Sequence, residues 1–365
     1  MKQLFLITIT LFFLVGCAQQ QTVVNVQQIN MDKKTFPPTR EEKIVPEQTE
    51  VLESAQILEQ DDTFKIALVF PSKIVGKYAK DTINTLTAYM LHHNIKFSFE
   101  VFDSNVQNIE NIKTTFTRVY EKGYSNVIVL YTPEALDNLF SINEINNFNI
   151  YLPLIHKNES KHELTNVVYG GIDYKAQIKK LFTLSNKANS IFYSDTTLGL
   201  KLKSYVEELS QNINVSTKIN QRSNEFKKIV REKGIKNSSL FLNTPIIKSS
   251  ILLSQLRAYD TVPYIILSTQ LNYTPLVISL TQYPDRKKFI VANSIEKINL
   301  KLQESLSLLG VDVAYNWVNY SSLIGIDSLF TKKQSKLFPN KIIDNQVQYG
   351  ITLHKNTRHG FKELR

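Results

Sequence analysis

The feature that most constrains this chain is a short apolar run from Phe64 to Phe70, which ends at Pro71-Ser72. A continuous apolar run bounded by turn residues predicts a strand buried on both faces, as in a parallel sheet covered by helices. A helical pattern follows from Lys77, and the unit of strand, turn and amphipathic helix then repeats along the chain. The sequence therefore predicts an α/β fold with two doubly wound parallel-sheet lobes that follow one another.

The expected elements can be assigned by residue range. In the first lobe we expect strands at 64–70, 95–102, 126–131 and 149–155, and helices at 77–94, 109–120 and 136–145. In the second lobe we expect strands at 167–169, 190–193, 214–219, 239–242 and 263–267, and helices at 175–184, 198–209, 226–233 and 246–259. Further strands are expected at 275–280 and 288–292, a long apolar helix within 311–330 and a closing hairpin within 342–353.

The N-terminus has the pattern of an export signal. Lys2 precedes an apolar run from Leu4 to Val15, which is too short for a membrane-spanning helix. The following Gly16-Cys17 completes a motif that resembles the lipobox of bacterial lipoproteins. The resemblance implies a signal peptide at 1–16 and a lipidated, palmitate-bearing Cys17, whereas the alternative is an ordinary signal peptide that contains a cysteine. Cys17 is the only cysteine, so the sequence predicts neither disulfides nor a cysteine metal cluster.

Residues 17–60 are expected to form a lipid anchor and disordered tether, because three prolines lie among Gln, Thr, Glu and Lys. The globular part is expected at 61–365. Ala18, rather than Asp, follows the cysteine. In lipoproteins this favours the outer membrane, facing the periplasm, over retention in the inner membrane. The sequence thus predicts a protein held to a membrane through lipidated Cys17.

The predicted globular part is basic. The whole chain has a net charge of +10, and residues 1–60 carry −2, which leaves +12 on residues 61–365. That charge could favour anionic glycans, lipid head groups or an acidic partner protein, or could simply reflect a lysine-rich solvated surface. The cations are spread in Lys-Lys pairs rather than long basic runs, so a nucleic-acid partner is not expected.

Two αβ lobes behind a lipobox resemble the type I periplasmic-binding-protein fold. Within it, Leu309 to Tyr315 followed by a helix resembles branched-chain amino-acid-binding proteins and also LpoA-like activators of penicillin-binding proteins. The activator resemblance implies a non-enzymatic envelope lipoprotein that contacts or activates a peptidoglycan synthase or related envelope assembly, and we adopt it as the first hypothesis. The alternative is a solute-binding lipoprotein that captures a small polar ligand for an ABC transporter or receptor.

Candidate ligand-binding residues come from the loops after strands, because ligands of open α/β sheets bind outside the carboxyl ends of the strands. They are Ser72, Tyr131, Thr132 and His156 in the first lobe, and Asp195, Asn243, Thr244, Ser268 and Thr269 in the second. Asp195 could meet an amine in a cleft, or it or Thr196 could cap the following helix. A Ser/Thr clamp with an acidic partner, as expected for a bound amino acid, is not evident. We expect no catalytic residues, cofactor or metal site, because nucleotide, hydrolase and metalloprotease motifs are missing from the sequence.

Overall fold

The computed structural model describes residues 63–364, apart from 223 and 335–336. The predicted signal peptide, the predicted lipidation site Cys17 and the predicted tether lie outside the described residues. The described residues form one compact unit, and the two lobes discussed below are both parts of that unit.

The first lobe is built on a mostly parallel sheet of seven strands in the described residues, in the order β11-β12-β5-β4-β3-β1-β2. The strands are β1 (Phe64–Phe70), β2 (Phe97–Asp103), β3 (Asn126–Val129), β4 (Asn149–Leu152), β5 (Val167–Tyr169), β11 (Ile342–Ile343) and β12 (Gln346–Val347). Only the β11–β12 pair is antiparallel among these pairings. Strand β1 pairs with β2 and β3, and Ile66 to Val69 are fully buried, which confirms that this interior strand is covered on both faces.

The second lobe repeats this design, with seven described strands in the order β14-β13-β10-β9-β8-β6-β7. They are β6 (Asn189–Ser194), β7 (Ile213–Ile219), β8 (Ser239–Asn243), β9 (Ile265–Ser268), β10 (Phe289–Asn293), β13 (Thr352–Asn356) and β14 (Phe361–Glu363). Strands β6 to β10 pair in parallel, whereas β13 and β14 pair antiparallel at the edge. The predicted doubly wound α/β architecture is therefore confirmed.

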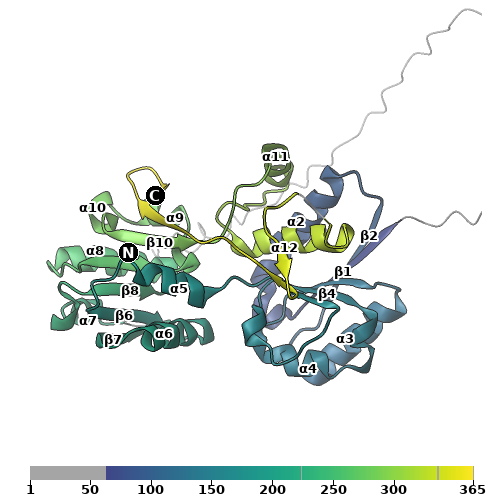
Figure 1. Cartoon of the computed structure of the whole chain (residues 1–365), viewed down its shortest axis with the longest axis horizontal. Coiled ribbons are helices and arrows are strands. Elements are labelled where there is room, and N and C mark those ends of the chain that lie inside the picture. The colour runs from purple at the N-terminus through teal and green to yellow at the C-terminus, as the bar shows by residue number, and fades with distance from the viewer. Residues whose placement is uncertain (1–62, 223, 335–336, 365) are drawn as a thin grey trace, which may run out of the picture. The chain divides into compact units, whose positions relative to one another are not determined.

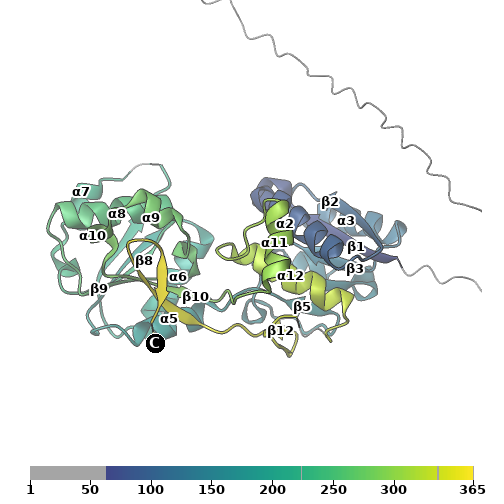
Figure 2. The ribbon, with the colours of Figure 1, turned by 90° about the horizontal axis from the view of Figure 1, so that it is seen from above.

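Helices cover both faces of each sheet (Figures 1 and 2). The first lobe has α2 (Ser72–His92), α3 (Ile109–Glu121), α4 (Leu136–Phe140), α11 (Leu300–Leu308) and α12 (Trp317–Phe330), with 3-10 turns η2 (Pro133–Ala135), η3 (Asn143–Asn147) and η4 (Lys157–Glu159). The second has α5 (Tyr174–Phe182), α6 (Thr197–Leu209), α7 (Phe226–Val230), α8 (Ile246–Ala258), α9 (Leu276–Leu280) and α10 (Tyr283–Arg286), with η5 (Lys233–Ile235) and η6 (Gln270–Asn272).

Several sequence-based assignments are wrong. The run 275–280, expected as a strand, is helix α9, whose N-cap Pro275 already has the helical φ of −62°. A short apolar run does not distinguish a strand from a buried helix, and a proline at the start favours the helix. The helix expected at 136–145 is interrupted after Phe140, and its remainder belongs to the 3-10 turn η3. The helix expected at 226–233 likewise ends at Val230, before the 3-10 turn η5. The strand at 167–169, expected in the second lobe, is β5 of the first sheet.

The lobes are not consecutive in sequence, contrary to the expectation. The chain crosses between them at 170–173, again at 294–299 and finally at 348–351 (Figure 2). Helices α11 and α12 therefore return to the first lobe, where both contact α2. The predicted closing hairpin is two hairpins, β11–β12 on the first sheet and β13–β14 on the second.

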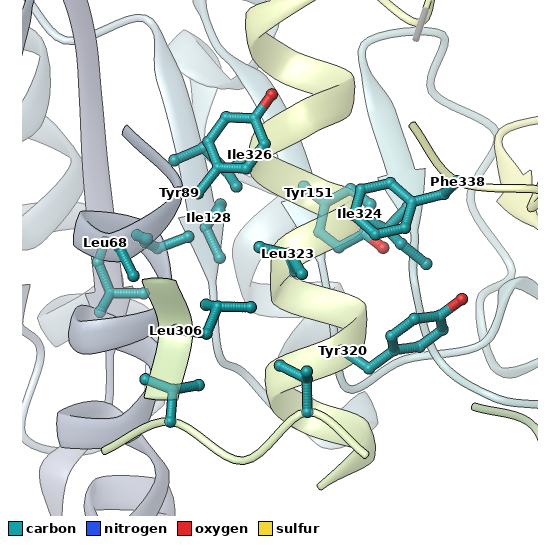
Figure 3. Close-up of a cluster of buried hydrophobic side chains, with 14 of the residues drawn as sticks. Leu68, Tyr89, Ile128, Tyr151, Leu306, Tyr320, Leu323, Ile324, Ile326 and Phe338 are labelled. Atoms are coloured by element: carbon teal, nitrogen blue, oxygen red, sulfur yellow. The ribbon is translucent and has the colours of Figure 1, made fainter. Parts of the chain in front are cut away.

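Helix α12 returns to the first lobe because its apolar side chains complete that lobe's core. Every residue from Val318 to Ser328 is buried. The buried set includes the polar residues Asn319, Ser321, Ser322, Asp327 and Ser328 as well as the apolar ones. Leu323 and Ile324 pack in one cluster with Leu68, Tyr89 and other residues of β1 and α2 (Figure 3). Within the described residues, no helix combines the length and apolar composition needed to cross a membrane.

Candidate ligand-binding cleft

The strand order places the candidate site. In each sheet the chain moves first to one side of its opening strand and then to the other, so the order reverses between β1 and β3 and again between β6 and β8. Crevices form at such switch points, outside the carboxyl ends of the strands. A cavity of about 510 Å³ lies there and is lined by residues of both lobes.

Aromatic and aliphatic side chains form most of the cavity wall. Tyr78 comes from the start of α2, Tyr174 is the first residue of α5 and Trp317 is the first residue of α12. The Tyr174 and Trp317 rings meet edge to face, with 6.5 Å between their centroids. The aliphatic residues of the wall are Ile74, Val75, Leu154, Ile172 and Leu198. The cavity therefore offers flat apolar surfaces from three helix starts.

Several polar groups of the wall are already paired with each other. Gln107 donates from Nε2 to Thr132 Oγ1 at 2.6 Å, and its Oε1 accepts from the Thr132 backbone N–H at 3.2 Å. Lys201, in the first turns of α6, forms an ion pair with Glu159 of η4. Because Glu159 belongs to the first lobe and Lys201 to the second, this ion pair links the two sides of the cleft.

Burial changes the electrostatics of the wall. It lowers the pKa of the Lys201 ammonium, while the Glu134 carboxylate acts in the opposite direction. Burial likewise raises the pKa of the Tyr174 hydroxyl, so this residue is neutral at physiological pH. The three charged residues of the wall are Glu134, Glu159 and Lys201.

The four first-lobe candidates from the sequence lie in four different environments. Thr132 lines the cleft. Ser72 begins α2, and its backbone N–H donates to Asp103 Oδ1 at 3.0 Å. Tyr131 is fully buried in the core on the opposite face of the sheet, where burial raises the pKa of its hydroxyl. His156 caps η4 by accepting from the Asn158 N–H, and it lines a different, polar cavity.

The second-lobe candidates lie away from the cavity wall. Asp195 is exposed, and Thr196, rather than Asp195, caps α6 by accepting from the Gly199 N–H at 3.1 Å. Asn243, Thr244, Ser268 and Thr269 are all completely buried at the ends of β8 and β9. The structure thus brings these four together inside the lobe, and their role in ligand binding stays a prediction.

Sequence reasoning missed Tyr78, Tyr174, Trp317, Lys201 and Glu159. It considered only residues in loops directly after strands, whereas these side chains come from the first turns of helices and from a 3-10 turn. Trp317 had one available signal, since it is the only tryptophan in the chain and lies at the start of a helical pattern.

The comparisons with known proteins concern the fold. No protein-family model and no curated protein matches the chain. Among solved structures, the chain is similar to a solute-binding protein of an ABC transporter from Rhodopseudomonas palustris HaA2, in complex with p-hydroxybenzoic acid. The TM-score is 0.62 at 11% identity, covering 83% of this chain and 96% of that one. It is also similar to the branched-chain amino acid transporter substrate-binding protein LivJ from Streptococcus pneumoniae, in complex with isoleucine, with TM-score 0.60, 8% identity and coverage of 83% and 100%.

LpoA from Haemophilus influenzae is a further similar structure, with TM-score 0.55 and 9% identity. The match covers 85% of this chain but only 60% of LpoA. The chain therefore has the type I periplasmic-binding-protein fold, which solute-binding proteins and LpoA share. Two of these three structures are described as binding proteins, and no enzyme family is identified.

Proposed function

We propose that this chain is a non-catalytic solute-binding protein that takes a small ligand into the cleft between its lobes. The observation that carries the proposal is the cavity of about 510 Å³ lined by both lobes, at the strand-order reversals. Small-molecule sites are typically concave, mostly apolar and about 300–1,000 Å³ in volume. The comparisons support this alternative better than the synthase contact that the sequence first suggested, because solute-binding proteins are more represented among the similar folds.

The cavity wall favours a ligand with a flat apolar or aromatic body. Tyr78, Tyr174 and Trp317 offer ring faces and edges, and aromatic pairs prefer offset or edge-to-face contact. The Gln107–Thr132 pair and the Glu159–Lys201 pair already satisfy each other. A free amino acid, whose two charges need separate partners, therefore fits less well than an aromatic solute with one polar group. The p-hydroxybenzoic acid in the Rhodopseudomonas palustris protein also has a flat aromatic body, with a hydroxyl and a carboxyl group at its two ends.

A thermal-shift screen tests the proposal. We expect one or more aromatic solutes to stabilise the protein, because a ligand at a hundred times its Kd adds about 2.7 kcal/mol to the free energy of unfolding. Tyr174→Leu should raise the ligand concentration that gives half of the thermal shift at least tenfold. Tyr264→Leu, a tyrosine that does not line the cavity, should leave the shift unchanged. A full screen of aromatic acids, amino acids and sugars without any shift would contradict the proposal.

The second candidate function is contact with a cell-wall synthase, and the observation that favours it is the similarity to LpoA. Crosslinking in intact envelopes tests it. Recovery of a peptidoglycan synthase with the wild-type chain, and equally with Tyr174→Leu, would favour this function over solute binding. Loss of the crosslink in Tyr174→Leu would instead make the partner dependent on an occupied cleft, as for a transporter or receptor.

We further propose that residues 1–16 are removed, that lipidated Cys17 holds the protein to the outer membrane facing the periplasm, and that 17–60 act as a tether for the body at 61–365. The support is the sequence Leu14-Val15-Gly16-Cys17 with Ala18. Labelling with a fatty-acid probe should be lost in Cys17→Ala. Persistent labelling of that variant would exclude this anchor.

A further inference from the structure

The amino-terminal edge of the second sheet, on the side opposite the carboxyl ends that face the cleft, has an unusual composition. The parallel register aligns the starts of four strands: Asn189 of β6 pairs with Ser239 of β8, and Ser239 pairs with Ile265 of β9. Ile266 of β9 in turn pairs with Phe289 of β10. The loops that enter these strands therefore lie side by side along one edge.

Hydrogen bonds join these entering loops into one surface. The Asn237 N–H donates to Val262 O at 3.0 Å, and the Tyr264 N–H donates to Ser238 O at 2.9 Å. Lys288 Nζ donates to Pro263 O at 2.9 Å, and Asn186 Nδ2 donates to Asn237 O at 2.8 Å. The segment 262–264 is therefore held between its neighbours, with the β8 loop on one side and the β10 loop on the other.

Apolar side chains are exposed at the middle of this edge. Tyr264 is 53% exposed and Val262 is 46% exposed, although the protein has a large apolar core in which to bury such side chains. Tyr259, 38% exposed, lies close by at the end of α8, under the side chains of Lys227 and Arg231. Exposed tyrosines beside cations are typical of surfaces that meet a membrane interface.

Lysines surround the apolar centre. Lys187, Lys233, Lys236, Lys287 and Lys288 are exposed in the loops that enter β6, β8 and β10. No ion pair is formed by any of these five within the described residues. The acidic residues nearest in sequence are Glu232, Asp260 and Asp285. Asp285 is buried and forms an ion pair with Arg257, whereas Glu232 and Asp260 are exposed. The edge therefore has an excess of positive charge around an apolar centre. We use the name lysine edge for the surface formed by these five lysines together with Val262 and Tyr264.

We propose that the lysine edge docks onto an anionic phospholipid surface. Lysine is a flexible point charge without the fork geometry that makes arginine suited to individual carboxylates. Lysines spread over separate loops match a diffuse layer of head-group phosphates, to which juxtamembrane cations are attracted. Val262 and Tyr264 can enter the head-group region while the lysines stay at the level of the phosphates. This docking is independent of the cleft and of its ligand.

A site-specific dye tests the proposal on the full chain. Because Cys17 is the only cysteine, Cys17→Ala combined with Val262→Cys allows a single environment-sensitive dye to be attached at the lysine edge. We expect its emission to shift to the blue with phosphatidylglycerol vesicles and not with phosphatidylcholine vesicles. The same dye at Leu308→Cys, 86% exposed on α11 of the first lobe, should not respond, so adsorption through another part of the chain is distinguished from docking of this edge.

Charge reversal supplies the matched control. Lys187→Glu, Lys236→Glu and Lys288→Glu together should raise the lipid concentration for half of the shift at least tenfold. The control variant reverses three exposed lysines elsewhere, Lys113→Glu, Lys161→Glu and Lys301→Glu, and so changes the net charge equally. It should alter the lipid concentration for half of the shift less than twofold. An unresponsive dye at position 262, an equal response at 308 or equal effects of the two triple variants would overturn the proposal. A shift with soluble polyglutamate but not with vesicles would also overturn it and indicate an acidic protein partner.

Discussion

The first lobe places an apolar helix against its sheet, whereas the second lobe fills the carboxyl ends of its strands with buried hydroxyl and amide groups. Helix α12 is buried from Val318 to Ser328, and its Leu323, Ile324 and Ile326 join a cluster of aliphatic and aromatic side chains (Figure 3). At the ends of β8 and β9 the completely buried residues are Asn243, Thr244, Ser249, Ser268, Thr269 and Asn272. Two sheets of the same topology are thus stabilised by different interactions.

The difference indicates which kind of substitution should destabilise each lobe. Apolar burial is non-directional, so the first lobe depends on volume and close approach. A buried polar cluster depends instead on whether each donor and acceptor has a partner. In the second lobe Asn272 Nδ2 has three acceptors, while both amide atoms of Asn243 lack a partner among the described residues. Substitutions can therefore test each kind of core separately.

The largest effect is expected from truncating the apolar core of the first lobe. Leu323 is completely buried, so Leu323→Ala should lower the free energy of unfolding by about 3 kcal/mol, since it removes apolar contacts and leaves a cavity. Leu308→Ala is the control, because Leu308 is 86% exposed. Chemical unfolding of both variants measures the difference. A loss below about 1 kcal/mol for Leu323→Ala would mean that α12 does not complete this core.

A smaller loss is expected where α12 approaches the sheet most closely. A Cβ on Gly325 would lie 2.5 Å from a ring carbon of Tyr151, whereas one on Gly76 of α2 would meet nothing nearer than 3.8 Å. Gly325→Ala should therefore cost about 2 kcal/mol by overpacking. Gly76→Ala should instead add up to about 1 kcal/mol, because alanine favours a helix more than glycine. Equal unfolding midpoints for the two variants would show that α12 packs less tightly than described.

In the second lobe, hydrogen bonding rather than volume should decide the effect. Asn272→Leu removes a donor to Leu242 O, Thr244 O and Ser268 Oγ, and we expect it to cost about 1–2 kcal/mol. Asn243→Leu replaces a buried amide without a described partner, and should be neutral or stabilising. Unfolding in urea compares the two variants. A cost at Asn243 as large as at Asn272 would reveal a partner, such as a buried water.

The smallest effect is expected from pH. Burial lowers the pKa of His354 in β13 from its ordinary value of 6.5, while Glu363 acts in the opposite direction. The folded state then binds fewer protons than the unfolded state below about pH 6.5, so His354 should make stability fall as pH falls through that region. His354→Gln should flatten the decline in Tm between pH 8 and pH 5, and His359→Gln, an exposed residue, should not. A steeper decline in His354→Gln would contradict the assigned direction.

Burial lowers the pKa of His156 in the first lobe as well, with Lys201 acting in the same direction and Asp173 opposing both. The lobes can therefore be compared by NMR titration of the two histidines. Both should retain neutral rings below the pH at which an exposed histidine is half protonated.

The strands were predictable from the sequence where an apolar run is bounded by turn residues, as at Phe64 to Phe70. The return of α12 to the first lobe was not, because contacts such as Tyr89 Oη to Asp327 Oδ1, at 2.7 Å, join residues far apart in the chain. A Cβ on either Gly170 or Gly171 would lie within 2.5 Å of other atoms. These glycines allow close packing where the chain first crosses between the lobes. No local sequence pattern predicts this role.

The cleft was predictable in position but not in composition. The strand-to-helix pattern places a site at the carboxyl ends of the strands, and Thr132 does line the cavity there. The aromatic wall depends on which helix starts face each other across the lobes, and this arises from three separate crossings. Asn243 and Thr269 were expected in open loops, but α8 and η6 follow these strands and the residues are buried within the lobe.

The most direct test of the proposed cleft is the fluorescence of Trp317. It is the only tryptophan in the chain and lines the cavity beside Tyr174, so its emission reports on the site without labelling. We predict that an aromatic solute found in the thermal-shift screen changes Trp317 emission saturably, at the concentrations that stabilise the protein, and that Tyr174→Leu weakens this response at least tenfold. A solute that stabilises the protein while leaving Trp317 emission unchanged would bind elsewhere, and would contradict the assignment of this cleft.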